Sequence, residues 1–178
     1  MEDLVVTKQK QEKTVILNRL FPEETLIIGA GNGMATFRQS AEVFKSGIFS
    51  PDECDLDAGG GATVEIPAQV WEMSEGSDAT FAEIFGFFET DLNKICFTPH
   101  QIILFCVQHL KRLLANGFAT YFLFKRGAHF RVAAVMVTPF KVSLPPTSLS
   151  LRISPLEFNG DWSGKFRRRI VIPEFLKK

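Results

Sequence analysis

The pattern of apolar and polar positions is clearest between residues 99 and 172. One broad face of a helix over 99–115 collects six apolar side chains, Ile103, Cys106, Val107, Leu110, Leu113 and Leu114. Thr98 is suited to the N-cap and Pro99 to the first helical position, while Asn116-Gly117 is a typical helix end. The pattern therefore predicts an amphipathic helix with defined ends.

Four strands are predicted after this helix, at 119–125, 130–137, 148–154 and 166–172. In the third strand Leu149, Leu151 and Ile153 alternate with polar residues, which places these three side chains on the inner face. Short turns at Gly127 and at 159–161 favour antiparallel neighbours. The sequence thus predicts an α+β fold in which the helix packs on a four-stranded antiparallel sheet.

The pattern before residue 99 is less regular and predicts a smaller mixed part. Within 9–20 it fits a helix or a helix running into a strand, and 25–28 reads as a short strand. A capping box at Thr36–Gln39 predicts a helix over 36–46, and 78–88 predicts another. A strand over 62–73 contains Pro67, which favours an edge or a bulge. We expect a single compact domain over 1–178, with a possible division into 1–61 and 62–178.

Composition adds a large aromatic core to this picture. The chain has eighteen Phe against one Tyr and two Trp, and Phe buries a large apolar area without a polar atom to satisfy. The core is expected to contain the Phe residues at 81, 85, 105, 122, 124 and 130.

The cysteines and the lengths of the apolar stretches indicate the cellular compartment in which the protein is expected. Three cysteines without a CxxC spacing are typical of a reducing compartment, so we expect a cytoplasmic protein. Residues 1–13 lack the apolar core of a signal peptide, and no apolar stretch has the length of a membrane span. No membrane association is expected.

Charge is separated along the chain although its sum is zero. Residues 51–97 hold eleven Asp/Glu and one Lys, whereas residues 108–178 hold thirteen Lys/Arg and three Asp/Glu. A dedicated nucleic-acid binder keeps a surplus of cations for the phosphates. We therefore expect the acidic and basic segments mainly to face each other within one molecule.

Three stretches resemble a group of short uncharacterised bacterial proteins. They are DATFAEIFGFF, NGFATYFLFKRGAHFRVAAV and DWSGKFRRRIVIPE, and the resemblance covers most of the chain after Phe21. It consists of aromatic strand patterns without a catalytic motif, so it implies a bacterial source and no particular chemistry.

The stretch TLIIGAGNGMATF is similar to the glycine-rich loop of class I methyltransferases. There, glycines such as Gly29, Gly31 and Gly33 let backbone amides approach S-adenosylmethionine. Three features favour a plain glycine turn instead. The predicted helix starts four residues after Gly33, no strand ending in an acid follows, and the later strands are not alternating β and α units.

Four potential metal ligands fall within fourteen residues, Cys96, His100, Cys106 and His109. On a helix the two histidines lie on opposite flanks and Cys106 lies on the apolar face, so no single ion collects all of them. No metal site is predicted. The same residues could form a nucleophile and base pair, but no third orienting group accompanies them, and no catalytic residues are assigned.

The last strand is strongly basic and suggests nucleic-acid binding. Arg167 and Arg169 share one face, and Lys165 and Trp162 could add a phosphate contact and a stacking platform. Charged residues on an edge strand also prevent edge-to-edge pairing, which is the competing interpretation.

No convergent set of acid, base, nucleophile and ligand is present, so the sequence favours a non-enzymatic interaction protein without a cofactor. Its expected partner is another protein, bound through a sheet surface or groove. The alternatives are a nucleic-acid-binding protein that uses the basic strand, and a small methyltransferase-like enzyme that uses the glycine loop.

Overall fold

The computed structural model describes residues 17–73, 79–115, 118–138, 148–158 and 167–174. Its strands are β1 (Leu17–Leu20), β2 (Leu26–Ile28), β3 (Ile48–Phe49), β4 (Ile66–Met73), β5 (Ala119–Arg126), β6 (His129–Thr138), β7 (Ser148–Pro155) and β8 (Arg168–Pro173). The α-helices among these residues are α1 (Phe81–Phe88) and α2 (Pro99–Gln108). Short 3₁₀ helices are η1 (Arg38–Ser40), η2 (Glu53–Asp57), η3 (Leu92–Ile95) and η4 (Leu110–Arg112).

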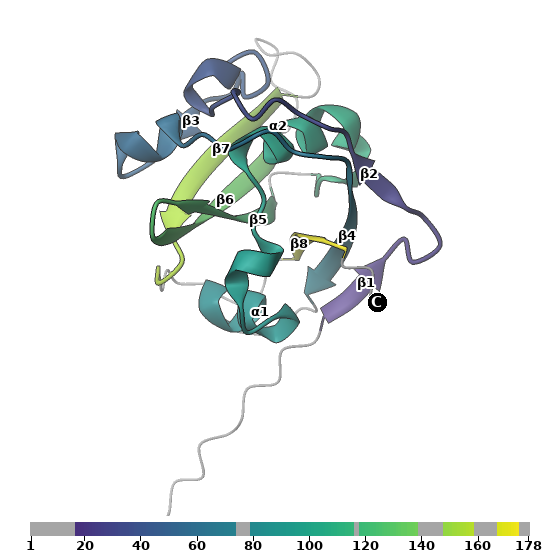
Figure 1. Ribbon diagram of the computed structural model, residues 1–178. Coiled ribbons are helices and arrows are strands. Elements are labelled where there is room, and N and C mark those ends of the chain that lie inside the picture. The colour runs from purple at the N-terminus through teal and green to yellow at the C-terminus, as the bar shows by residue number, and fades with distance from the viewer. Residues whose placement is uncertain (1–16, 74–78, 116–117, 139–147, 159–166, 175–178) are drawn as a thin grey trace, which may run out of the picture.

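The eight described strands form one mixed sheet in the order β1-β4-β8-β5-β6-β7-β3, and β2 also pairs with β4 (Figure 1). β1 and β2 lie one after the other along the same edge of β4. Two neighbouring pairs are parallel, β5 with β8 and β3 with β7, and the others are antiparallel. Strands from before and after residue 62 thus share one sheet.

The predicted fold, a helix on a four-stranded antiparallel sheet, is wrong. β5, β6 and β7 do form the expected antiparallel meander, but β8 does not continue it. Instead β8 lies between β4 and β5, parallel to β5. Its run Ile170-Val171-Ile172 is buried throughout, as in a central strand covered on both faces. Alternation of apolar and polar residues along the chain predicts where strands lie, but it does not predict which strands pair with each other.

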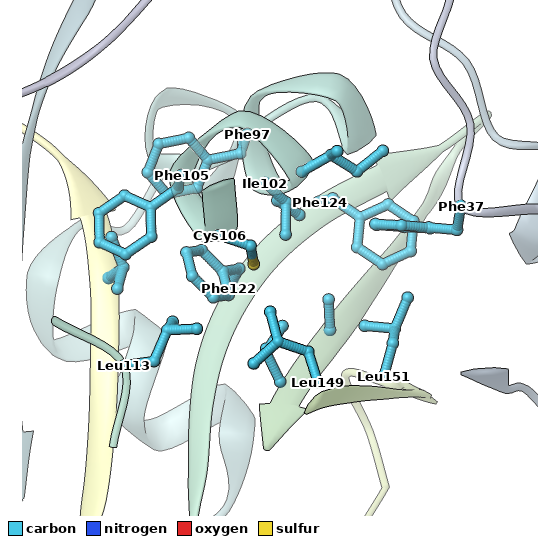
Figure 2. Close-up of a cluster of buried hydrophobic side chains, with 14 of the residues drawn as sticks. Phe37, Phe97, Ile102, Phe105, Cys106, Leu113, Phe122, Phe124, Leu149 and Leu151 are labelled. Atoms are coloured by element: carbon cyan, nitrogen blue, oxygen red, sulfur yellow. The ribbon is translucent and has the colours of Figure 1, made fainter. Parts of the chain in front are cut away.

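One face of the sheet packs on α2. Figure 2 shows Ile102, Phe105 and Cys106 of α2 pointing toward Phe122 of β5. The Phe105 and Phe122 rings meet edge to face with centroids 5.3 Å apart, which adds an aromatic contribution to simple burial. Phe37, from the segment before η1, makes the same kind of contact with Phe124.

The opposite face packs on α1 and η3. Side chains alternate along β5, so Tyr121 points away from Phe122 and meets Phe81 of α1, with ring centroids 5.2 Å apart. Burial raises the pKa of Tyr121 to about 12, against the opposing positive charges of Arg168 and Arg152. The predicted aromatic core is therefore divided by the sheet into two clusters.

Helix boundaries depend on capping side chains. Thr98 and Gln101 form a capping box that starts α2, as the sequence predicts for the N-terminus, and Gln101 is only 5% exposed. α2 ends at Gln108, earlier than predicted, and η4 continues the chain. Val107, placed on the apolar face by its periodicity, is exposed in the structure.

Two predictions before α2 are wrong. The segment predicted as a helix over 36–46 contains only η1 and turns. β4 is not an edge strand, since it has neighbours on both sides. Pro67 is tolerated because it lies opposite Glu174, one residue beyond the end of β8, where the ladder with β4 stops.

Candidate functional site

The glycine loop of residues 29–33 has its three candidate amides bound within the protein. Gly29 N–H donates to Gln108 Oε1 at 3.1 Å and Gly33 N–H donates to His100 Nδ1 at 3.0 Å. Gly31 N–H donates to the Thr63 carbonyl at 3.1 Å. A cofactor phosphate or carboxylate would have to displace these acceptors before it could use the amides.

Close packing explains why glycines occupy this loop. A Cβ on Gly31 would lie 3.0 Å from the His100 ring, and one on Gly29 would lie 2.9 Å from Gln108. Gly33 has φ +74° and would place its Cβ 2.2 Å from the Gly61 carbonyl oxygen. These glycines let the chain after β2 lie directly against both ends of α2.

The outer edge of β2 is also bound by His109, the residue that directly follows α2. His109 Nε2–H donates to the Ile27 carbonyl at 2.8 Å, beside the Gly29–Gln108 hydrogen bond. His100 and His109 therefore bind different parts of the segment 27–33. The methyltransferase-like role of the glycines remains a prediction, and the geometry gives them a structural role.

Arg169, one of the candidate nucleic-acid contacts, is held inside the molecule. Its Nη1 donates to the carbonyls of Arg112 and Leu113, at 2.8 and 3.2 Å, and its Nη2 donates to Glu72 at 3.3 Å. It thereby satisfies carbonyls at the end of η4. Arg167 is exposed, and Trp162 and Lys165 lie outside the described residues. The basic strip remains a prediction that would have to function without Arg169.

The cysteines and histidines that suggested metal chemistry do not converge. In the part of the chain that the structure describes, no three His, Cys, Asp or Glu side chains gather as metal ligands would. Cys106 is 1% exposed in the core, and burial raises the pKa of its thiol. Partial burial also raises the pKa of Cys96 to about 12, so neither thiol ionises readily at neutral pH.

The acidic and basic segments, which the sequence predicts mainly to face each other, meet only in part. Asp52 and Asp55 pair with Arg126, Asp55 also pairs with Arg131, and Glu72 pairs with Arg169. Other acids of the 51–97 segment pair elsewhere, among them Asp57 and Glu53 with Arg38.

Asp55 is the centre of the largest of these clusters. Its carboxylate is fully buried, and both oxygens accept from Arg131 Nε at 3.0 Å. Arg126 Nε lies 3.2 Å from Asp55 Oδ1. Arg126 Nη1 lies 2.8 Å from Asp52 Oδ2, which makes an ion pair but not a hydrogen bond of suitable geometry. The cluster fastens η2 to the β5–β6 hairpin.

Local turns bring these acids into position. Asp52 caps η2 by accepting the Cys54 N–H at 2.9 Å, which together with Arg126 lowers the pKa of Asp52. Ser50 Oγ lies within hydrogen-bond distance of both the Asp52 carbonyl and Asp55. The segment 50–57 is thus ordered by its own polar side chains and attached to the sheet by arginine.

Between this segment and the end of β7 lies a groove of ≈ 780 Å³, which we call the β3–β7 groove. One wall comes from β3 and the chain after it, and the other from β6, β7 and the residues that follow. The lining residues are Ile48, Phe49, Ser50, Pro51, Glu53, Leu56, Met136, Arg152, Ile153, Ser154, Pro155 and Phe158. Phe49 is 60% exposed and Phe158 39% exposed, so aromatic surface faces solvent here.

A second hollow of ≈ 530 Å³ lies at the end of α2, lined by Leu26 and residues 107–112. Its polar side chains are largely engaged. Gln108 and His109 bind the loop after β2, and Arg112 forms an ion pair with Glu24 and stacks on Phe21. The β3–β7 groove is therefore the better candidate for recognition.

Sequence reasoning missed the groove because its walls lie about a hundred residues apart in the chain. β3 is only two residues long, too short for a periodic signal. The available hint was Arg152, a charge in the alternating run SLSLRIS on the side opposite Leu151 and Ile153.

No protein-family model, curated protein or solved structure matches this chain. The resemblance to uncharacterised bacterial proteins, the bacterial source and the cytoplasmic location remain predictions. Among the described residues, no helix combines the length and apolar character needed to cross a bilayer.

Replacing Gly33 by Ala tests whether the glycine loop is structural. The positive φ and the contact with the Gly61 carbonyl should lower the free energy of unfolding by about 2 kcal/mol. Gly59→Ala is the matched control, since its Cβ would meet nothing within 4 Å, and it should change stability by less than about 1 kcal/mol. Urea unfolding curves measure both. Equal stabilities of the two variants would show that packing does not require Gly33.

Asp55→Asn tests the ion cluster in the same way. Removing the buried charge leaves Arg126 and Arg131 without their shared anion, and the free energy of unfolding should fall by about 3 kcal/mol. Asp57→Asn, in the same 3₁₀ helix, breaks only an exposed pair with Arg38 and should lower stability far less than Asp55→Asn. A loss at Asp55 no larger than at Asp57 in urea unfolding would refute the role given to the cluster.

Proposed function

We propose that this chain is a non-enzymatic binding protein that holds an apolar segment of a partner protein in the β3–β7 groove. The observation that carries the proposal is the exposed aromatic surface of Phe49 and Phe158 at a hollow whose other lining is mainly apolar. Exposed apolar surface rimmed by polar residues is typical of interaction sites.

Burial of Phe49 supplies the driving force. Full burial of an exposed Phe side chain contributes about 1.5–3 kcal/mol. Because Phe49 is 60% exposed, most of that contribution would arise only when a partner covers the ring. Met136, Leu56 and Ile48 extend the apolar lining beside it. A few apolar side chains entering this groove would give a moderate, reversible affinity.

The sheet edge at β3 is better suited to binding a partner through side chains than to pairing with an additional strand of the partner. β3 is a two-residue edge strand, and β7 ends in Pro155, which has no N–H to donate. These features leave a short backbone edge for an incoming strand. The groove offers side-chain pockets in place of a hydrogen-bonding ladder.

The charged lining residues also favour binding over catalysis. Glu53 and Arg152 are the charged residues of the lining, and Glu53 lies 3.7 Å from Arg38 in an ion pair. The lining holds no histidine, cysteine or lysine. It therefore lacks the paired acid and base or activated nucleophile that an enzyme requires.

Selection of peptides on the immobilised protein tests this function. A phage library of random linear twelve-residue peptides should yield apolar sequences whose micromolar binding falls at least tenfold in Phe49→Ser, because the ring forms part of the groove. Phe87→Ser is the matched control, since Phe87 is 57% exposed but lies on α1. Its binding should stay within twofold of the unmodified protein.

Two results would contradict the proposal. One is the absence of any enriched peptide that binds in solution by fluorescence anisotropy. The other is a set of peptides that bind Phe49→Ser and the unmodified protein equally well.

A further inference from the structure

Arg152 is the one described arginine whose guanidinium has no hydrogen bond or ion pair among the residues that the structure describes. The structure includes all nine arginines of the chain. Six of them pair with acids, namely Arg19, Arg38, Arg112, Arg126, Arg131 and Arg169. Arg167 and Arg168 also have partners. Arg152 lines the β3–β7 groove, so its lack of a partner among the described residues suggests that it pairs with a ligand.

We infer that the segment bound in the β3–β7 groove carries an Asp or Glu side chain, and that Arg152 binds its carboxylate. This inference rests on the proposed function and adds the chemistry of the ligand. It makes Arg152 the residue that determines specificity, while Phe49 and its apolar neighbours supply most of the affinity.

Strand register places Arg152 beside aromatic surface. Arg152 lies opposite Phe49 of β3 on one side and opposite Ala134 of β6 on the other, so the three side chains share one face of the sheet. Ala134 is small, and the positive charge of Arg152 reaches Tyr121, which lies opposite Ala134 on β5. Arg152 thus lies between the exposed Phe49 and the part of the sheet where Ala134 packs against the second hydrophobic cluster.

The surrounding acids are already engaged. Glu53 pairs with Arg38, and Asp52 and Asp55 pair with Arg126 and Arg131. An incoming carboxylate would therefore find Arg152 uncompensated. Arginine suits this task because its planar donors match a carboxylate in a bidentate fashion and its face stacks on a ring such as Phe49.

The position of Arg152 favours an acid within the segment over a chain terminus. Along the groove, Met136 lies on one side of Arg152, and Pro155 and Phe158 lie on the other. A carboxylate at Arg152 would thus be flanked by apolar side chains in both directions. Phosphate-rich ligands fit poorly, since the lining offers a single arginine together with Glu53.

The contribution of the Arg152–carboxylate pair to binding depends on how far the bound segment shields it from water. In the unbound protein Arg152 is exposed, and an exposed ion pair contributes little. An apolar segment in the groove would exclude water from the pair and strengthen it. We expect loss of the pair to weaken binding by about five- to tenfold.

The test uses peptides selected as described above, synthesised with an amidated C-terminus so that only side chains carry carboxylates. Each Asp or Glu in a Phe49-dependent peptide is changed to Asn or Gln, and affinity is measured for the unmodified protein and for Arg152→Gln. One acid-to-amide change and Arg152→Gln should each weaken binding about five- to tenfold, and the two together should cause no further loss. Lys111→Gln, which removes an exposed charge at η4, should leave affinity unchanged.

The outcomes separate the two proposals. The role of Arg152 would be overturned by Phe49-dependent peptides that contain no Asp or Glu. It would also be overturned if replacing every acid of such a peptide left its affinity for the unmodified protein unchanged. Either result would leave the proposed binding function standing. Absence of any Phe49-dependent peptide would overturn both. Should Arg152→Gln fail to fold, Arg152→Lys replaces it, and an acid-to-amide change that weakens binding equally in the unmodified protein and in the Arg152 variant would also overturn the role of Arg152.

Discussion

The β3–β7 groove depends on the buried carboxylate of Asp55. One wall of the groove is the segment after β3, which has almost no regular secondary structure of its own beyond η2. Asp55 holds that segment against the sheet through Arg126 and Arg131. A buried ion pair is costly to desolvate, so it adds little net stability, but it strongly disfavours any arrangement that separates its members. The cluster therefore specifies where the wall lies.

The sheet supplies the rigid side of the same groove. β6 and β7 are covered on one face by the core that contains Phe122, Phe124 and Leu151. On the other face α1 and η3 cover the region around β5 and β8. Arg152 and Phe49 lie on that second face near the β3 edge, where both are exposed. The groove thus lies where the second hydrophobic cluster ends and the edge of the sheet begins.

Local signals predicted the start of α2 and the buried face of β7, although the capping box at Thr36 did not lead to the helix predicted over 36–46. Thr98 and Gln101 start α2, and the alternation of Leu149, Leu151 and Ile153 gives the buried face of β7. Pairing could not be predicted in the same way, because the place of β8 between β4 and β5 depends on contacts far apart in sequence. The continuous apolar run Ile170–Ile172 was the available sign that β8 is central. The glycine loop shows a related limit, since the sequence does not show that His100 and Gln108, some seventy to eighty residues away, pack on its glycines.

The central claim, that ligands bind between β3 and β7, is tested most directly by an NMR titration of the labelled protein with a selected peptide. Amide signals of Ile48, Phe49, Met136 and Ile153, and the methyl signals of Ile48, Met136 and Ile153, should shift with one common dissociation constant, because these residues line the groove. Signals from the glycine loop and from residues 107–112 should stay in place. The account would be contradicted if the largest shifts fell at the end of α2 or around Arg167 while the groove signals remained unchanged.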